Sequence, residues 1–188
     1  MELKSLLSAY TPYNEQEAAD LSVIRDALDR YPDLYERSNL VLHLTASSWI
    51  TNPKRDRILM VYHNIYDSWS WTGGHADGEQ DLFAVAIREA KEETGLFSVQ
   101  PISDAIFSIE TLTVNAHRKR GKFVPSHLHL NVTYLLEADE KDPLRSKPDE
   151  NSAVAWFSRE DAIAACSEPC MIPIYRKLNE KLDALCEN

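Results

Sequence analysis

The sequence predicts an α/β fold, an α/β/α sandwich built on a mixed β-sheet and preceded by a helical extension. Two observations lead to this prediction. Strand-like runs lie both before and after one central amphipathic helix, and further helical patterns follow the last of these runs. Helices flanking a sheet are a stable way to bury the apolar faces of both. Because strands and helices do not alternate regularly, a doubly wound parallel sheet is not expected.

Residues 1–37 are expected to form the helical extension. Apolar side chains recur there at the spacing of an amphipathic helix, at Ala18, Leu21, Ile24 and Leu28. Asn14 is the expected N-cap, because its side chain can accept a hydrogen bond from an amide of the first turn. We expect a single domain over residues 1–188, in which residues 38–188 form the core.

Strand-like runs fill much of that core. They are rich in β-branched, apolar and aromatic residues and are bounded by turn residues. The runs cover residues 39–50, 58–64, 69–71, 105–114, 127–138 and 153–157. The polar turn between the first two predicts a hairpin. The basic loop 117–122, at the tip of a hairpin, is expected to be solvated, and binding of a terminal phosphate is the alternative.

Three helices are expected after the first strands. Asp81 can cap the central helix and Gly95 can end it, with Phe83, Ile87 and Ala90 facing inward. Ser158 is the expected N-cap of a second helix. The last helix is expected over residues 173–187, with one apolar face made of Tyr175, Leu178, Leu182 and Leu185.

Composition limits the classes of function. The net charge is −10, which disfavours binding to a nucleic acid polymer. No apolar run is long enough to span a membrane, and the first residues do not look like a signal peptide. The three cysteines, Cys166, Cys170 and Cys186, are too few and too clustered for a disulfide framework and are not expected to form a zinc site. A cytoplasmic location is therefore expected.

The central helix carries an unusual acidic cluster. Glu89, Glu92 and Glu93 lie at positions i, i+3 and i+4, where like charges repel on one helix face. Converging carboxylates suit a hard cation such as Mg²⁺ or Mn²⁺, and Arg88 can orient one of them. The alternative is a solvated acidic face with ordinary ion pairs.

Residues 74–96 decide between these alternatives. This stretch resembles the Nudix box, G-x5-E-x7-R-E-U-x-E-E-x-G-U, where U is a bulky aliphatic residue. Every single-residue position matches except Gln80, which replaces the first glutamate and has Glu79 beside it. Ala90 is small for its aliphatic position. On these residues the chain is identified as a member of the Nudix hydrolase superfamily, whose fold agrees with the one predicted above.

The resemblance implies a mechanism and the residues that carry it. Family members hydrolyse a nucleoside diphosphate linked to another moiety and use Mg²⁺ or Mn²⁺ as cofactor. When the family's functional positions are transferred to this sequence, the implied metal ligands are Glu89, Glu92, Glu93 and the carbonyl of Gly74. The implied catalytic residues are Arg88, Glu89, Glu92 and Glu93. The general base is not assigned. Asp149 and Glu150 are its candidates outside the box, and a solvated loop is the alternative for both.

Further residues are candidates for substrate binding. They are His75, His127, His129 and Glu150. His127 and His129 alternate along one strand with Asn131, so all three share a face, which lines a cleft or simply covers the sheet. The expected partner is a small-molecule diphosphate, with no membrane and no nucleic acid polymer, and a homodimer is left open. Two alternative functions are an enzyme similar to isopentenyl-diphosphate isomerase and a non-catalytic nucleotide-binding regulator with a degenerate box.

Overall fold

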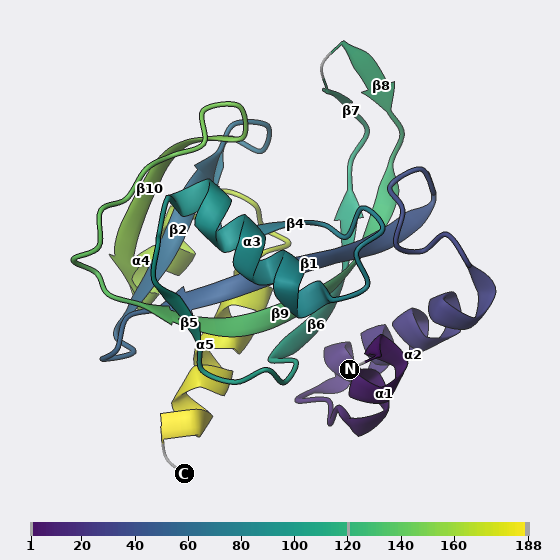
Figure 1. Cartoon of the computed structure of the whole chain (residues 1–188), viewed down its shortest axis with the longest axis horizontal. Helices are drawn as coiled ribbons and strands as arrows, with labels where there is room; N and C mark the ends of the chain where they lie inside the picture. The colour runs from purple at the N-terminus through teal and green to yellow at the C-terminus, as the bar shows by residue number, and fades with distance from the viewer. Residues whose placement is uncertain (1, 120, 187–188) are drawn as a thin grey trace. The chain divides into compact units, whose positions relative to one another are not determined.

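The computed structural model describes residues 2–119 and 121–186, without the side chains of Lys119 and Cys186 (Figure 1). The chain divides into two compact units. The first unit consists of the residues up to Ser47 together with Gly73–Ala86 and Ala105–Tyr134. The second unit consists of Ser48–Thr72, Ile87–Asp104 and the residues from Leu135 onward.

Helices and strands occur in both units. The helices are α1 (Leu3–Ala9), α2 (Glu15–Arg30), α3 (Leu82–Thr94), α4 (Arg159–Ala165) and α5 (Ile172–Cys186). The strands are β1 (Leu42–Thr51), β2 (Arg57–His63), β3 (Ser68–Ser70), β4 (Thr72–His75), β5 (Val99–Pro101), β6 (Ser108–Val114), β7 (His117–Lys119), β8 (Lys122–Val124), β9 (His127–Ala138) and β10 (Asn151–Ser158). The α/β class predicted from the sequence is confirmed.

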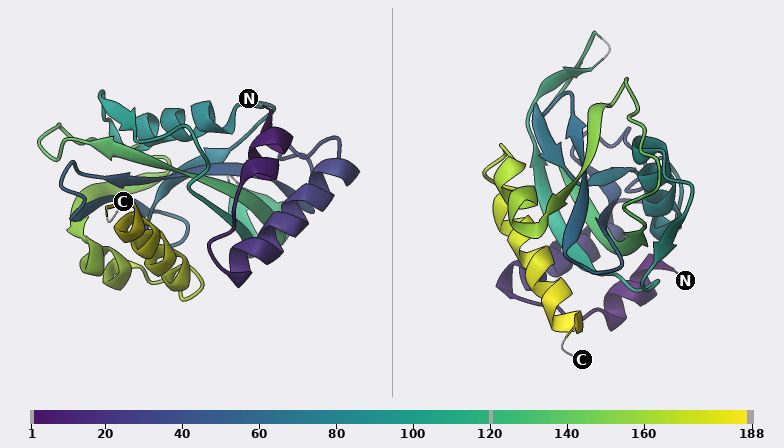
Figure 2. Two further views of the ribbon diagram at one scale, coloured as in Figure 1. Left: turned by 90° about the horizontal axis from the view of Figure 1, so that it is seen from below. Right: turned by 90° about the vertical axis from the view of Figure 1, so that its left-hand side faces the viewer.

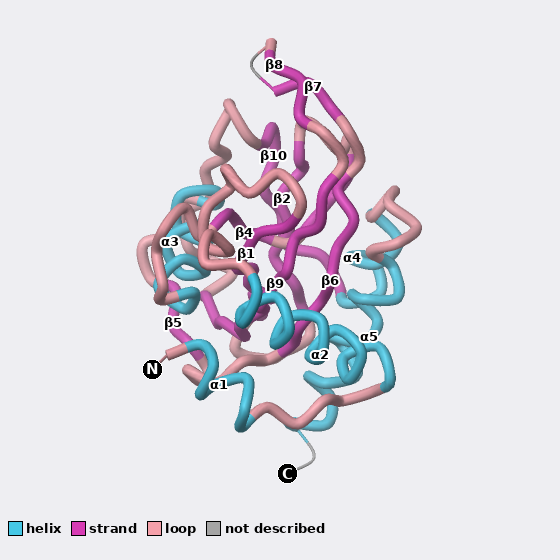
Figure 3. The backbone as a smooth tube through the Cα atoms, turned by 90° about the vertical axis from the view of Figure 1, so that its right-hand side faces the viewer, coloured by secondary structure: helices cyan, strands magenta, loops and turns pink. Residues whose placement is uncertain are grey.

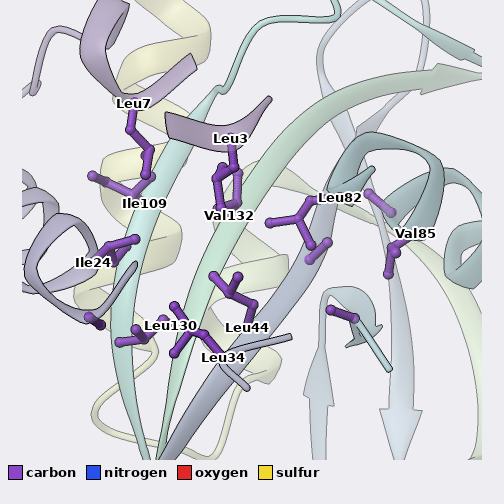
Figure 4. Packing of buried hydrophobic residues seen from close by; sticks show 14 of the residues in the cluster. Leu3, Leu7, Ile24, Leu34, Leu44, Leu82, Val85, Ile109, Leu130 and Val132 are labelled. Carbon is purple, nitrogen blue, oxygen red and sulfur yellow. The ribbon is translucent and has the colours of Figure 1, made fainter. Parts of the chain in front are cut away.

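In the first unit, α1 and α2 pack on strands β6 and β9 (Figure 3). The two strands pair antiparallel from Ser108 opposite Thr133 to Val114 opposite His127. Figure 4 shows the resulting core, in which Leu7 of α1 lies beside Ile109 and Leu3 lies beside Val132. Removing such apolar side chains from water is what holds these helices on the strands.

In the second unit, α4 lies against strands β2, β3 and β10 and also packs on α5 (Figure 2). β10 and β1 both pair antiparallel with β2, and Ile50 of β1 lies opposite Leu59. Tyr175 of α5 is fully buried, with its ring 5.2 Å from that of Trp49. Its hydroxyl contacts Ser70 Oγ at 3.2 Å, so α5 is joined to the strands by both apolar and polar contacts.

Most local expectations are confirmed. Asn14 caps α2 by accepting a hydrogen bond from the Glu17 amide at 3.0 Å, and Ser158 caps α4 by accepting one from the Asp161 amide at 3.1 Å. The predicted β1–β2 hairpin forms. Among the described residues, no helix is long and apolar enough to cross a membrane. That residues 1–188 act as one domain stays a prediction.

Some local expectations are wrong. The basic stretch 117–122 is not a plain loop, because β7 and β8 pair antiparallel within it, with His117 opposite Val124; Arg120 lies outside the described residues. In α3, Phe83 packs against the core of the first unit and Ala90 is buried, as expected, but Ile87 is only half-buried, and Leu82, Val85 and Ala86 also face that core. Leu185 of α5 is exposed. Strands β4 and β5 were not expected, because each is too short to show a periodic pattern.

Candidate active site

Helix α3 presents the acidic cluster on its C-terminal half, which belongs to the second unit. The helix starts after Asp81, whose carboxylate accepts a hydrogen bond from the Ala84 amide at 3.1 Å. It ends at Gly95, which has φ +73°, a conformation that glycine adopts without steric cost. A Cβ atom at Gly95 would also lie 2.8 Å from Cβ of Arg145. This glycine therefore ends the helix and lets a distant loop approach it.

The loop over residues 145–151 is fastened to the end of α3 by backbone groups. The Arg145 amide donates to the Thr94 carbonyl at 2.8 Å, and the buried side chain of Asn151 donates to the Glu93 carbonyl at 3.0 Å. Unpaired helix-end carbonyls need such partners when they are buried. The Glu150 amide donates to the Lys147 carbonyl at 2.8 Å, which closes a tight turn. These bonds bring Glu150 to the acidic face of α3.

Three carboxylates converge there. One oxygen each from Glu89, Glu93 and Glu150 lies within 4.8 Å of the other two. Glu93 is buried, with 4% of its surface exposed, whereas Glu89 and Glu150 are half-buried. Several carboxylate oxygens around a partly enclosed point are the donor set that Mg²⁺ prefers. The residues present therefore fit the hard cation expected from the sequence.

Two basic side chains border the cluster. Lys147 contacts carboxylates of both Glu92 and Glu150, each at 2.9 Å, and Arg88 contacts Glu89 at 3.0 Å and Glu92 at 3.9 Å. Four carboxylates thus face two cations, so two negative charges are left over among these six residues. One divalent cation would balance that excess, which supports the fit.

The ionisation of these groups reflects the same arrangement. Burial raises the pKa of Glu89 above its ordinary value, and the Arg88 guanidinium offsets part of the rise. Partial burial opposes the charge of Lys147, but hydrogen bonds with Glu150 and Glu92 outweigh it and raise the pKa of its ammonium group. Lys147 therefore stays positively charged at neutral pH and holds Glu92 and Glu150 near the cluster.

The residues predicted from the sequence to form the site do not all lie together in the structure. Glu89 and Glu93 lie together, and Glu150, expected as a substrate-binding residue, lies with them. Glu92 contacts Lys147 and Arg88. Gly74 belongs to the first unit, and its part in binding metal stays a prediction. Asp149 is exposed. Lys147 was missed, although its spacing of three residues from Glu150 is a signal for an ion pair in a turn.

The candidate histidines lie in the first unit. The rings of His75, His127 and His129 surround that of His43, with centroids 4.8–5.1 Å from it. His43 was missed, because one histidine in an apolar strand usually packs in a core. Asn131, on the same face of β9, is buried and donates to Glu110 at 2.9 Å. Its side-chain oxygen accepts from Thr45 and Ser47, so Asn131 is part of a buried polar network and does not line a cleft.

Comparison with known proteins adds an independent finding. The family model described as NUDIX domain matches residues 41–178. Over 115 residues the chain is 32% identical to the m7GpppN-mRNA hydrolase NUDT17 of Xenopus laevis, covering 58% of this chain and 36% of that protein. It is 26% identical over 110 residues to a "Probable DHNTP pyrophosphohydrolase" of Lactococcus lactis, covering 58% of this chain and 63% of that protein. The chain thus spans less than two thirds of either relative.

Solved structures share the fold. The Ap4A hydrolase of C. elegans, in a binary complex, superposes with a TM-score of 0.55 at 22% identity, covering 77% of this chain and 97% of that one. The E. coli dihydroneopterin triphosphate pyrophosphohydrolase gives a TM-score of 0.52 at 14% identity, covering 71% of this chain and 92% of that one. At these identities the likeness concerns the fold alone, and the fold agrees with the one predicted from the sequence.

Proposed function

Since the chain belongs to the NUDIX family, we propose that it is a metal-dependent hydrolase that cleaves the diphosphate linkage of a nucleoside diphosphate joined to another moiety. The observation that carries the proposal is the convergence of Glu89, Glu93 and Glu150 within 4.8 Å of one another. Hydrolysis of a diphosphate depends on charge neutralisation and positioning more than on covalent catalysis, and this cluster is suited to both.

Each charged residue has a part in the proposal. Glu89, Glu93 and Glu150 hold Mg²⁺ or Mn²⁺, and Glu92 is a further ligand in the family pattern. A bound cation of this kind neutralises diphosphate charge and lowers the pKa of water. Arg88, which contacts Glu89 at 3.0 Å, orients that carboxylate. The general base is a carboxylate of this cluster, which accepts the proton of the attacking water.

The substrate class follows from the relatives. Their names refer to a capped RNA, a dinucleoside polyphosphate and a pterin triphosphate, and these compounds share a phosphoanhydride bond. We propose a small-molecule substrate with this bond. We also propose a cytoplasmic location, because the free thiols of Cys166 and Cys170 are typical of a reducing compartment. Binding to membranes or to long nucleic acids is not part of the proposal.

A panel assay tests the function. The purified chain is incubated with Mg²⁺ or Mn²⁺ and, in separate reactions, with a nucleotide sugar, Ap4A, dihydroneopterin triphosphate and a capped oligonucleotide. Products are identified by mass spectrometry in ¹⁸O-labelled water, because the label reports which phosphorus is attacked. We expect metal-dependent cleavage at an anhydride bond of at least one substrate, with the label in a phosphate product.

Two outcomes would contradict this function. Binding of nucleotides without turnover of any substrate would favour the non-catalytic regulator. Conversion of isopentenyl diphosphate to its isomer, with no phosphate released, would favour the isomerase. Nucleotide binding is measured by calorimetry, and isopentenyl diphosphate is supplied as a separate substrate whose isomer is identified by NMR, because the two isomers have equal masses.

A further inference from the structure

Four histidines meet on one face of neighbouring strands in the first unit. The Leu128 amide of β9 donates to the Val41 carbonyl at 2.9 Å, just before β1, and the Ala76 amide after β4 donates to the Leu44 carbonyl at 3.1 Å. Backbone pairing on both sides of this end of β1 thus brings β9 and β4 beside it (Figure 1). His127 and His129, two residues apart, point to the same face.

His43, at the centre, has a buried nitrogen without a partner. Its side chain is 4% exposed. Its Nδ1 lies 3.0 Å from the Asn39 carbonyl, which can only accept, so Nδ1 carries the proton and Nε2 keeps a lone pair. That Nε2 is buried and has no hydrogen-bond partner. Buried polar atoms are nearly always paired, so an orphaned one in a native fold calls for a partner such as a water or an ion.

His127 orients His129 in a similar way. Nδ1 of His127 lies 2.9 Å from the Pro125 carbonyl, so it too carries a proton. A neutral His127 can therefore only accept at Nε2, which lies 3.1 Å from Nε2 of His129. His129 donates this hydrogen bond and keeps its lone pair on Nδ1. Metal-binding histidines usually donate their other ring N–H to an outer acceptor that fixes the tautomer, and His127 is that acceptor for His129.

We propose that His43, His75 and His129 bind a first-row transition cation of the Zn²⁺ type, with His127 as the positioning residue for His129. One ring nitrogen from each of the three lies within 4.8 Å of the others. Zn–N bonds of about 2 Å place tetrahedral ligands roughly 3.3 Å apart, so the three ring nitrogens must draw closer together when the cation binds. Neutral imidazole is a ligand for Zn²⁺, Co²⁺ and Ni²⁺ and not for Mg²⁺.

An anion site is the competing use of such a cluster, and the structure disfavours it. A phosphate site needs ring N–H groups aimed at the anion, but Nδ1 of His43 and Nδ1 of His127 already donate to the Asn39 and Pro125 carbonyls, which leaves only an acceptor nitrogen on each neutral ring. Ring centroids 4.8–5.1 Å apart make charging several rings together unfavourable. The site is separate in chemistry from the carboxylate cluster and does not depend on the proposed hydrolase activity.

Metal titration tests the proposal. The chain is stripped with a chelator, dialysed into excess Mg²⁺ to saturate oxygen ligands, and titrated with Co²⁺, whose visible absorption reports nitrogen ligands; Zn²⁺ is then added in competition. We expect about one equivalent of Co²⁺, displaced by Zn²⁺. The variants His75→Gln and His129→Gln should bind at least about 100-fold more weakly, and His127→Gln about 10- to 100-fold more weakly, as outer partners do.

Controls separate this site from the rest of the chain. His117→Gln is the first control and should bind Co²⁺ as the parent does. His117 lies on β7, and the hydrogen bond described for its side chain is with the nearby Asn115 carbonyl. Glu93→Gln should also keep the nitrogen-type spectrum. Thermal midpoints without metal establish that each variant folds, and the half-exposed His75 provides a second ligand variant should His129→Gln misfold.

Two results would overturn the proposal. One is a Co²⁺ titration with no nitrogen-type absorption, or with equal affinity in the parent and His75→Gln. The other is loss of pyrophosphate binding in His129→Gln with no effect on Co²⁺, which would assign the cluster to an anion.

Discussion

Replacing Glu93 by Gln tests the carboxylate cluster directly. The change keeps the shape of a side chain that is 4% exposed and removes one charge within 4.8 Å of Glu89 and Glu150 oxygens. At an effective dielectric constant of about 20, each such pair of charges repels by roughly 3 kcal/mol. Arg88 and Lys147 already offset much of that repulsion. Without metal, we therefore expect the free energy of unfolding to rise by about 1 kcal/mol, which is about 2–4 °C in thermal midpoint for a chain of this size.

Metal binding and turnover should change in the opposite direction. Loss of one ligand should lower kcat/KM about 100-fold or more, the size of effect seen when an electrostatic catalytic group is removed, or about 2.7 kcal/mol. Excess Mg²⁺ should stabilise the parent, by about 2.7 kcal/mol at 100 times its Kd, but stabilise Glu93→Gln much less. The assay is turnover on a working substrate together with thermal midpoints with and without Mg²⁺.

Lys91→Gln is the matched control, because Lys91 is exposed on the same helix and lies outside the carboxylate cluster. It should leave both turnover and the Mg²⁺ effect nearly unchanged. If Glu93→Gln turned over substrate like the parent and had a lowered midpoint, Glu93 would be a structural residue and the reasoning about this helix face would be refuted.

Three more predictions concern the same site. Excess EDTA should abolish turnover and added Mg²⁺ or Mn²⁺ should restore it; undiminished turnover in EDTA would exclude the metal mechanism. Gln80→Glu should change kcat/KM by less than about tenfold, or about 1.4 kcal/mol, and an inactive parent that becomes active on this change would indicate a degenerate box. Lys147→Gln removes the cation that contacts Glu92 and Glu150. The free energy of unfolding without metal should fall by about 1 kcal/mol, which lowers the thermal midpoint by a few degrees. The Mg²⁺ affinity of this variant should rise, because Lys147 no longer competes with Mg²⁺ for these carboxylates. An unchanged affinity in a Mg²⁺ titration would contradict this competition.

Local sequence was enough to predict the main helices and their ends. Asn14 and Ser158 cap α2 and α4 as expected, and Gly95 ends α3 with a positive φ. These features depend on hydrogen bonds and backbone preferences within a few residues, which any window of sequence contains. For the same reason, the spacing of Glu89, Glu92 and Glu93 within one helix was sufficient to predict a shared acidic face.

That Glu150 joins this acidic face was decided by tertiary structure alone. Glu150 reaches Glu89 and Glu93 because Asn151 donates to the Glu93 carbonyl, a contact between residues far apart in the chain that no local pattern encodes. The same loop brings Lys147 to Glu92.

The histidine cluster shows the same division. Alternation along β9 indicated that His127 and His129 share a face, but His43 and His75 join them only through backbone pairing with β1. Strand periodicity determines which side of a strand a residue faces, whereas the neighbour it meets there depends on which strands pair and in which register. A single strand carries no information about its partner, so the sequence by itself predicted the faces and the folded chain decided what meets on them.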